Sequence, residues 1–549
     1  MRKTTHSRNE NRSLYFYETH TAKVAITVST TLVQALQNPQ LYPHTVRAFR
    51  VLETHISWVV LTGVYAYKIK KPVNLGFLDF STLEQREHFC HEELRLNRRF
   101  APQLYLEVVS IRGTLEQPRF DGTEPVIEYA VKMLEFDQQQ RVDSLLANNE
   151  LGIDTMDQFA ADLAALHAQA SQASQASHET AYGTAKSVWA PMEENFVQIR
   201  SAVPDLDVIS ILEKLEHWCC AEFTRQRELL TERKRGGGVR ECHGDLHTRN
   251  LVRIDGRILA FDCLEFNANL RWIDVISEIA FLMMDLEACG RSAYAWRFIN
   301  RYLEHSGDYP GVTLLPLYLT YRALVRAKVA CLQAPPESHA EFQHYLALAQ
   351  RYTTASKPFL IIMQGLSGSG KSTLSQRLAD QLGLIRVRSD VERKRMFALD
   401  PYAVRSAALE SVIYTASVTD SVYRHLATLA QSLLTAGYST VLDATFLLRV
   451  QRDLLRNLAQ RLRVPFVILR CHAPNNFLKH AITQRARAGG DASDADVQVL
   501  QRQIASQEPL DGTEIAEAIE LDVSVNFDVT TLEQRLRRRV DALSSPGFQ

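Results

Sequence analysis

Residues 359–373 read F-L-I-I-M-Q-G-L-S-G-S-G-K-S-T, an apolar run that leads straight into a loop of small residues. Consecutive apolar residues before a glycine are typical of a buried β-strand. The four fixed positions of a G-x-x-x-x-G-K-[ST] pattern follow at once, and they are Gly365, Gly370, Lys371 and Ser372. The stretch therefore predicts a strand, a phosphate-binding loop and a helix over 371–382.

The residue types of this loop suit a phosphorylated ligand. Glycines let successive backbone N–H groups turn toward one anion, and the positive end of the following helix adds to that attraction. Lys371 has the position that reaches the outer phosphates, and Ser372 has the position of a Mg²⁺ ligand. We therefore expect ATP and Mg²⁺ as cofactors. The expected nucleotide contacts are Gly365, Ser367, Gly368, Ser369, Gly370, Lys371, Ser372 and Thr373.

The charges of the 549-residue chain are balanced, with 62 Lys and Arg against 63 Asp and Glu, for a net charge of -1. Such a balance provides no global field that would attract nucleic acid or an anionic membrane. The eight cysteines form no C-x-x-C pair, and no apolar run approaches the length of a membrane span. These features predict a cytoplasmic protein with reduced thiols and no membrane partner.

A chain of this length divides into more than one core. Short strands over 48–69 predict an antiparallel sheet, whereas strands that alternate with helices after residue 357 predict a doubly wound parallel sheet. The expected fold class is an α+β domain followed by an α/β domain. The expected segments are a flexible tail (1–24), a first domain (25–332) with a small lobe (25–136) and a helical lobe (137–332), a helical connector (333–356), and a second domain (357–545).

Local signals predict three smaller features. Ser81 and Glu84 have the spacing of a capping box at the start of a helix. The apolar stretch 272–289 predicts a hydrophobic helix that Gly290 closes, and residues 523–527 predict a last strand.

A second polar stretch, H-G-D-L-H-T-R-N at 243–250, lies between a short strand and a hairpin that ends at Asp262. Phosphoryl transfer needs one carboxylate to orient the attacking hydroxyl, and an amide oxygen with a second carboxylate to hold Mg²⁺. Asp245, Asn250 and Asp262 have the residue types for these tasks. The alternative is a hairpin loop in which Asp and Asn are ordinary turn residues.

Carboxylates also follow two of the later strands. Asp390 comes after the strand 384–387, and Asp443 after the strand 439–442. Ligands of a parallel sheet bind at the carboxyl ends of its strands, so both residues are candidates for a site there. The alternative for Asp390 is that it only caps the next helix.

Arg485 and Arg487 precede a glycine-rich segment at 489–494. A glycine-hinged segment with paired arginines suits a lid that closes over transferring phosphates. The alternative is an ordinary charged helix face.

Residues 45–330 resemble the aminoglycoside phosphotransferase branch of the protein-kinase-like fold, through H-G-D-L-H-T-R-N at 243–250 and A-F-D-C at 260–263. The resemblance implies Asp245 as catalytic base, with Asn250 and Asp262 as metal ligands. It also implies Lys68 as the nucleotide-phosphate lysine, with Glu93 or Glu92 as its partner on a helix, although Lys70 points to the same face as Lys68. The chain departs from the family pattern at the nucleotide loop, where residues 53–57 contain no glycine.

Residues 357–545 resemble the small P-loop kinases grouped with polynucleotide kinase, gluconate kinase and zeta-toxin-like enzymes. The residues that carry this resemblance are G-L-S-G-S-G-K-S-T (365–373), R-S-D-V-E-R-K (388–394), V-L-D-A-T-F (441–446) and the arginine pair of the lid. It implies Asp390 as the base on the acceptor side and Arg393 as a contact to substrate or phosphate. The order of the two domains resembles a bacterial group in which a phosphotransferase-like domain is fused to an ATP-binding kinase domain.

Three functional hypotheses follow. The first is an ATP-dependent phosphotransferase with two Mg²⁺–ATP sites that act on the hydroxyl of a small-molecule acceptor. The second is a nucleotide- or ligand-sensing N-terminal domain that regulates a P-loop ATPase or kinase. The third is phosphorylation of 5′-hydroxyl nucleic-acid ends by the C-terminal domain, which the balanced charge disfavours.

Overall fold

The computed structural model of the chain forms two compact units. The first unit comprises Met1–Arg141, His243–Asp245 and Leu259–Arg271, and the second comprises Val142–Cys242, Leu246–Ile258 and Trp272–Gln549. The residues that the structure describes are 30–76, 78–172, 182–332, 337–399, 413–488, 492–493, 495–525 and 528–544. The predicted tail (1–24) lies outside them, and the predicted domain bounds stay predictions.

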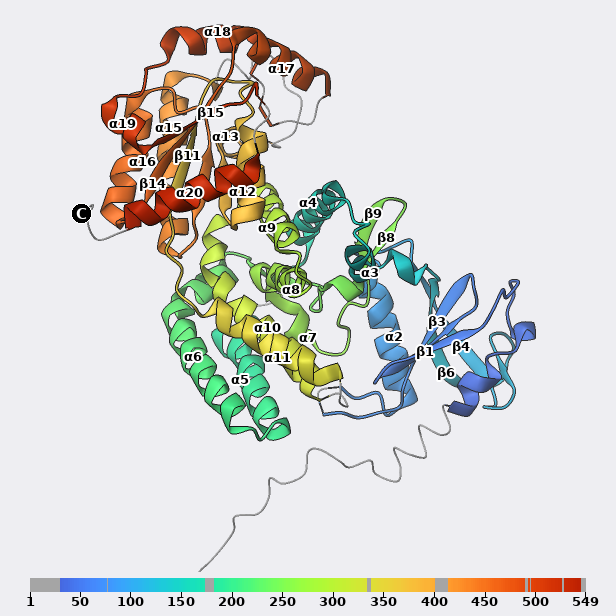
Figure 1. Ribbon diagram of the computed structural model, residues 1–549. Helices are drawn as coiled ribbons and strands as arrows, with labels where there is room; N and C mark the ends of the chain where they lie inside the picture. Colours follow the sequence, from blue (N-terminus) through green and yellow to red (C-terminus); the bar gives the residue numbers. More distant parts are fainter. Residues whose placement is uncertain are drawn as a thin grey trace, which may run out of the picture. The chain divides into compact units, whose positions relative to one another are not determined.

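The first unit is built on a six-stranded antiparallel sheet with the order β1-β2-β3-β6-β4-β5. Strands β1, β3, β4 and β6 of this sheet are labelled in Figure 1. Helix α2 packs against β4 and β6. The core of this sheet combines side chains of β2, β3, β4 and β6, among them Trp58, Tyr67 and Ala130, with apolar side chains of residues 32–42. The elements are η1 (Pro39–Leu41), β1 (Arg50–Glu53), β2 (Ser57–Leu61), β3 (Tyr65–Lys70), α2 (Leu83–Asn97), β4 (Tyr105–Gly113), β5 (Pro118–Arg119), β6 (Val126–Leu134), η2 (Gln138–Gln140) and α7 (Ala268–Arg271).

The capping box of α2 lies one residue later than predicted. Thr82 accepts a hydrogen bond from the backbone N–H of Gln85 at 3.2 Å, and the side chain of Gln85 accepts one from the N–H of Thr82 at 3.4 Å. The hydroxyl of Ser81 instead donates to Asp79 at 2.6 Å. The prediction of Ser81 and Glu84 was wrong because two overlapping polar pairs have the required spacing and the earlier serine is held by a turn.

The first part of the second unit is helical. Its elements are α3 (Val142–Ala147), α4 (Ile153–Gln169), α5 (Ala185–Ala202), α6 (Leu206–Arg235), β7 (Val239–Glu241), η3 (Thr248–Asn250), β8 (Leu251–Ile254), β10 (Trp272–Asp274), α8 (Val275–Ala288), α9 (Ser292–Ser306), η4 (Tyr309–Leu314), α10 (Leu315–Cys331) and α11 (Glu337–Tyr352). Strand β8 pairs with β9 (Arg257–Ala260) in the predicted hairpin.

Helix α8 begins later than the predicted helix 272–289. Trp272–Asp274 form strand β10, which pairs with β7 in antiparallel register. Asp274 then caps α8, because its carboxylate accepts a hydrogen bond from the N–H of Ile276 at 2.9 Å. The same carboxylate is held by Arg233 at 2.7 Å. An apolar run does not distinguish a short buried strand from a helix start, so the sequence placed this boundary wrongly.

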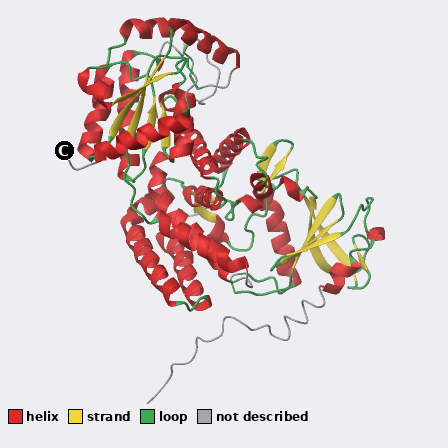
Figure 2. Ribbon diagram, in the orientation of Figure 1, coloured by secondary structure: helices red, strands yellow, loops and turns green. Residues whose placement is uncertain are grey.

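The last part of the second unit has a five-stranded parallel sheet with the order β12-β13-β11-β14-β15. Figure 2 shows its strands enclosed by helices. The central strand β11 is buried along its whole length, and α12 and α20 pack against the same core cluster as β11, β13 and β14. The elements are β11 (Leu360–Gln364), α12 (Lys371–Leu382), β12 (Ile385–Arg388), α13 (Ser389–Arg395), α15 (Ala416–Thr435), β13 (Thr440–Asp443), α16 (Arg449–Leu462), β14 (Phe466–His472), α17 (Asn475–Ala488), α18 (Val497–Ser506), α19 (Gly512–Glu517), β15 (Ala518–Asp522) and α20 (Val529–Ser544).

The last strand lies before the predicted segment 523–527. Strand β15 ends at Asp522, whose carboxylate accepts a hydrogen bond from the N–H of Ser524 at 2.9 Å. This Asx turn ends the strand, and the alternation that buries Ile519 and Leu521 precedes it. Residues 526–527 lie outside the described part of the chain. Within the described residues, no helix combines the length and apolarity that crossing a membrane requires.

Candidate active sites

The loop between β11 and α12 has a backbone shape that depends on glycine. Gly365 has a φ of +152°, and a Cβ atom there would lie 2.2 Å from the carbonyl oxygen of Cys471. Gly368 has a φ of +83°, and its Cβ atom would lie 2.7 Å from the carbonyl oxygen of Leu478. Because real Cβ atoms do not approach carbonyl oxygens so closely, only glycine fits these two positions. The loop therefore has the tight turn of a phosphate-binding cradle, as predicted.

Lys371 begins helix α12 and is 8% exposed. Its ammonium group donates to the carbonyl of Leu366 at 2.7 Å and to the hydroxyl of Ser369 at 3.4 Å, so it lies across the loop. Burial lowers the pKa of Lys371, and the carboxylate of Asp443 opposes this shift. A buried ammonium that oxygens of the loop solvate is suited to an anion placed in the same loop.

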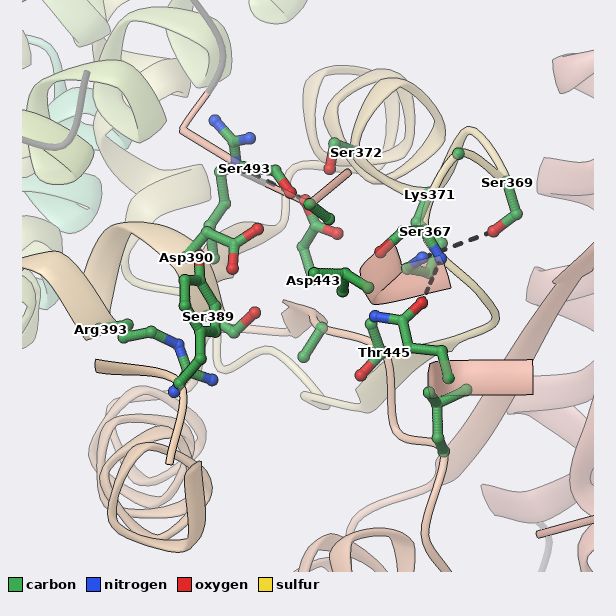
Figure 3. A pocket seen from close by; sticks show the side chains of 18 of the residues that line it. Ser367, Ser369, Lys371, Ser372, Ser389, Asp390, Arg393, Asp443, Thr445 and Ser493 are labelled. Carbon is green, nitrogen blue, oxygen red and sulfur yellow. Dashed lines mark hydrogen bonds and ion pairs between the residues drawn. The ribbon is translucent and has the colours of Figure 1, made fainter. Parts of the chain in front are cut away.

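A cavity of about 930 Å³ adjoins the loop. The predicted site residues that line it are Ser367, Gly368, Ser369, Gly370, Lys371, Ser372, Thr373, Asp390, Arg393, Asp443 and Arg485. Figure 3 shows Asp390 and Arg393 on one side and the loop on the other, with Asp443 between them. The carboxyl ends of β11, β12 and β13 supply the loop, Asp390 and Asp443, as the parallel sheet predicts.

Asp390 lies in the first turn of α13, where it does not act as the N-cap. Burial raises the pKa of Asp390, although Arg393 and Ser493 lower it. The alternative that Asp390 only caps the helix therefore has no support in the geometry. A carboxylate with a raised pKa that faces a cavity has the properties of a general base.

Arg393 is 6% exposed. Its guanidinium donates to the carbonyl of Ile413 at 2.9 Å and to the hydroxyl of Thr419 at 3.3 Å, and it lies 4.8 Å from the ring centroid of Tyr414. In the part of the chain that the structure describes, its Nε has no hydrogen-bond acceptor. Arg393 thus lines the cavity and keeps one buried N–H that has no acceptor among the described residues.

The two arginines of the predicted lid differ. Arg485 on α17 lines the cavity and donates to the carbonyl of Ala495 at 2.7 Å. Arg487 is exposed and is not part of the cavity lining. The structure therefore places Arg485 at the site and Arg487 on the exposed side of α17. Residues 489–491 and 494 of the predicted hinge (489–494) lie outside the described residues.

The sequence missed several residues of this site. Gln503 on α18 accepts a hydrogen bond from the loop N–H of Ser367 at 2.9 Å. Its only sequence signal is an amphipathic helix after the lid, which does not single out one residue. The other cavity-lining residues that the sequence did not mark include Thr419, Tyr423 and Arg502.

The first unit contains a cluster of buried charges around Glu93, which is fully buried. Lys68 donates to Glu93 at 2.7 Å, and Lys70 donates to the other oxygen of Glu93 at 2.7 Å. Burial alone would raise the pKa of Glu93, but the two lysines lower this pKa to about 2. Glu93, rather than Glu92, is the partner of the lysines, and Glu92 pairs with Arg95 and Arg271 instead.

The two lysines differ in their second partner. Lys68 also donates to Asp262 at 2.5 Å, whereas Lys70 pairs with the buried Glu265. The side chain of Asp262 is 46% exposed and that of Glu265 is 4% exposed. Lys68 therefore connects the cluster to a carboxylate that solvent and ligands can reach, and Lys70 belongs to the core.

Asp262 has an unusual backbone. Its φ is +64°, and its N–H donates to the hydroxyl of Tyr105 at 3.0 Å. His243 holds the preceding residue, because its Nε2 lies 2.9 Å from the carbonyl oxygen of Phe261. Positive φ is costly for a residue with a side chain and is found where a site needs a particular orientation.

Asp245 and Asn250 belong to different units. Asp245 follows His243 in the first unit, where its N–H donates to Nδ1 of His243 at 3.4 Å. Asn250 is 8% exposed and lies in η3 of the second unit, next to Thr248, whose hydroxyl donates to Asp285 at 2.6 Å. The structure brings Lys68, Glu93 and Asp262 together, and a metal site that combines Asp262 with Asn250 stays a prediction.

The turn between β1 and β2 is closed without glycine. The N–H of Thr54 donates to the carbonyl of Ser57 at 2.9 Å, and the Thr54 hydroxyl accepts from the N–H of Ser57 at 3.0 Å. Glu53 pairs with Lys71 at 2.5 Å. Side-chain hydrogen bonds thus replace the flexible glycine loop that the resemblance would have supplied.

The chain combines a protein-kinase-like α+β part with a P-loop α/β part, which confirms the predicted fold class. A family model described as "AAA domain" matches residues 360–510. The uncharacterized protein Rv2004c of Mycobacterium tuberculosis is 33% identical over 461 residues, which are 83% of this chain and 90% of that protein. The chain therefore belongs to the family of Rv2004c, as do the uncharacterized proteins MT2060 of M. tuberculosis and Mb2027c of Mycobacterium bovis, with the same identity and coverage.

Solved structures match each part of the chain at low similarity. A sugar kinase from Janibacter sp. is 24% identical, with 34% of this chain and 99% of that chain covered and a TM-score of 0.26. A gluconokinase from Sinorhizobium meliloti is 19% identical over 34% of this chain and 93% of its own, with a TM-score of 0.24. A choline/ethanolamine kinase family protein from Mesorhizobium loti is 10% identical, with 59% and 94% covered and a TM-score of 0.38.

Proposed function

We propose that the chain is an ATP-dependent phosphotransferase with two Mg²⁺–ATP sites, which transfers phosphate to a hydroxyl of a small-molecule acceptor. The observation that carries this proposal is the phosphate-binding loop, which faces Asp390 across a cavity large enough for a nucleotide and an acceptor. The loop supplies the anion cradle and Asp390 supplies a base, so both requirements of hydroxyl phosphorylation are met in one cavity.

The residues around the loop fit ATP and Mg²⁺. Added Cβ atoms would clash with the carbonyl oxygens of Cys471 and Leu478 at Gly365 and Gly368, so the loop can take this shape against β14 and α17 only with glycine there. Ser372 and Asp443 provide a hydroxyl and a carboxylate, and within the described residues no cluster of three or more His, Cys, Asp or Glu is arranged for a metal. This is the pattern expected for Mg²⁺, which protein sites bind through one or two side chains together with phosphates and water. Mg²⁺ would neutralise charge on the transferring phosphate.

The chemistry at this cavity rests on four side chains. Asp390 takes the proton of the acceptor hydroxyl as the hydroxyl oxygen bonds to the γ-phosphorus of ATP, and the bond from that phosphorus to the bridging oxygen breaks to release ADP. Lys371 and Arg485 stabilise the charge on the transferred group, and Arg393 orients the acceptor or the phosphate. Most of the rate enhancement comes from positioning and charge stabilisation.

The first unit supports a second site of the same chemistry. Lys68, held by Glu93, has the environment of a lysine that contacts nucleotide phosphates, and Asp262 next to it is a metal ligand candidate. Asp245 would be the base of this site. We assign these roles to Glu93 and Lys68, and not to the alternatives Glu92 and Lys70.

A regulatory N-terminal part is the second candidate. The observation that favours it is the closed turn at Thr54, because the N–H groups of Thr54 and Ser57 are already bonded within the turn and are not turned toward a phosphate. In that case the first unit would bind nucleotide or ligand without turnover and would control the P-loop site.

A phosphate-transfer screen on the full chain separates these candidates. Labelled ATP is offered with a library of small hydroxyl compounds and with 5′-hydroxyl oligonucleotides, and labelled product is measured for the wild type, Lys371→Ala and Asp245→Asn. If Lys371→Ala lowers phosphate transfer to one acceptor and Asp245→Asn lowers transfer to another, the chain has two active sites. Transfer that only Lys371→Ala removes favours the regulatory candidate, and label on oligonucleotides alone replaces the small-molecule acceptor by a nucleic-acid end.

A further inference from the structure

Helix α9, which lies outside the P-loop part in sequence, contacts the edge of the parallel sheet. Strand β12 is the edge strand, so one side of its backbone has no neighbouring strand. Asn300 of α9 is fully buried and bonds to that side, donating to the carbonyl of Leu384 at 2.8 Å and accepting from the N–H of Arg386 at 2.7 Å. One side-chain amide thus pairs with β12 as a neighbouring strand would.

Arg386, the residue that Asn300 holds, reaches the P-loop site with its side chain. One terminal nitrogen of its guanidinium donates to Asp443 at 3.1 Å and to the carbonyl of Ser372 at 3.2 Å. Ser372 and Asp443 are the residues proposed to face Mg²⁺. The other terminal nitrogen donates to Glu304 of α9 at 3.2 Å and to Gln376.

These three charges are removed from water. The side chain of Glu304 is 1% exposed, and those of Arg386 and Asp443 are each 4% exposed. Arg388 lies 3.6 Å from Asp443, and Lys371 adds a further positive charge near it. Three cations therefore surround Asp443. Glu304 pairs with one of them, Arg386, so its negative charge offsets part of the positive potential that Arg386 creates at the site.

We propose that Glu304 is a positioning residue of the P-loop site, which balances and orients Arg386 so that Asp443 stays available to Mg²⁺. The proposal rests on the proposed nucleotide site of the P-loop part. Under this proposal, the P-loop site depends on the negative charge of Glu304, which belongs to α9 in the helical part of the second unit.

Removing the charge of Glu304 should weaken the binding of ATP with Mg²⁺. In Glu304→Gln the amide keeps the shape and an acceptor for Arg386, but Asp443, which pairs with Arg386 at 3.1 Å, then balances a larger share of its positive charge. Asp443 becomes a poorer partner for a cation, so binding of ATP with Mg²⁺ weakens more than binding of ATP without it. Contacting charges in one network typically couple by about three- to a hundredfold, and we expect roughly tenfold here.

The matched control is Arg297→Gln on the same helix. Arg297 pairs with Asp157 at 2.6 Å and with Asp380 of α12 at 3.2 Å, so it also joins α9 to the P-loop part by a charge. Its partners are not Asp443 or Arg386. A loss of packing between α9 and the sheet would affect both variants, whereas the proposed role affects only Glu304→Gln.

The experiment measures equilibrium binding of ATP to the full chain over a range of Mg²⁺ concentrations, counting only the binding that Lys371→Ala removes. We expect Glu304→Gln to need roughly tenfold more Mg²⁺ for half-maximal binding. Glu304→Asp should lie closer to the wild type, and Arg297→Gln should equal it. In an Arg386→Met background, Glu304→Gln should produce no additional change.

An unchanged Mg²⁺ requirement in Glu304→Gln, or an equal change in Arg297→Gln, overturns the proposal and leaves the nucleotide site intact. If Glu304→Gln does not fold, the test uses Glu304→Asp, which keeps the negative charge. The proposal then requires that Glu304→Asp has the Mg²⁺ dependence of the wild type. A wild-type chain that shows no ATP binding sensitive to Lys371→Ala overturns both this proposal and the proposed function.

Discussion

The loop at Gly365–Thr373 and the cluster around Glu93, which we propose to bind the same kind of ligand, are built by different means. The loop presents main-chain N–H groups and one lysine from nine consecutive residues. The cluster assembles side chains, since Lys68 meets a glutamate 25 positions away and an aspartate 194 positions away. The main-chain loop depends on glycine, whereas the side-chain cluster depends on a balance of buried charges. Glycine substitutions should therefore disrupt the loop, and removal of one charge should disrupt the cluster.

The largest effect is expected at Lys371. Lys371→Ala removes the buried ammonium that crosses the loop, and transfer at the P-loop site should fall by about 10³-fold, as for other preorganised charge contacts. Labelled-product assays with acceptors of each site measure it. Transfer at the Asp245 site should stay at the wild-type rate, and a parallel loss there would mean that the two sites are one.

Gly365→Ala tests the main-chain cradle itself. The new Cβ atom would lie 2.2 Å from a carbonyl oxygen, so the loop must shift, and a displacement of about 1 Å costs roughly 10²-fold in transfer. Nucleotide binding and transfer rates measure the effect. The control is Gly512→Ala, because nothing lies within 4 Å of a Cβ atom there. Normal ATP binding by Gly365→Ala would contradict the glycine requirement.

The side-chain cluster is tested by comparing its two lysines. Lys68→Met should lower transfer at the Asp245 site by at least about tenfold relative to Lys70→Met, because only Lys68 connects to the exposed Asp262. Lys70→Met should be the less stable variant in thermal unfolding, since it leaves Glu93 and Glu265 short of a buried partner, at a cost of about 3–5 kcal/mol. Equal transfer rates for the two folded variants would contradict this division.

The smallest effect is a shift in pH dependence. A base must be ionised to accept a proton, so transfer at the P-loop site should fall as the pH is lowered through the pKa of Asp390, which burial raises. The acid limb of kcat/KM should therefore lie above the ordinary aspartate value of about 3.9. Asp390→Asn should remove the limb together with most of the transfer, and a limb at the ordinary value would argue against Asp390 as the base.

Features whose residues are consecutive in the sequence could be predicted from it, and features that join distant residues could not. The phosphate-binding loop was predicted residue by residue, because its chemistry lies in consecutive backbone positions. The parallel sheet and the ends of β12 and β13 followed from alternating strands and helices, which placed Asp390 and Asp443 at the cavity.

The side-chain cluster was predicted only in part. The sequence left Lys68 and Lys70 open because they share a face of β3, and the structure shows that both reach Glu93. What separates them is a second partner on a distant segment, which no local pattern contains. Asn300 and Glu304 have the same character, since each contacts the parallel sheet more than 80 positions later and neither forms a motif.

Counting the nucleotide sites tests the central claim most directly. Equilibrium binding of ATP with Mg²⁺ to the full chain should give two nucleotides per chain, one of which is lost in Lys371→Ala and the other in Lys68→Met. A single nucleotide per chain that Lys371→Ala removes completely would contradict the account, because the protein-kinase-like part would then have no ATP site of its own.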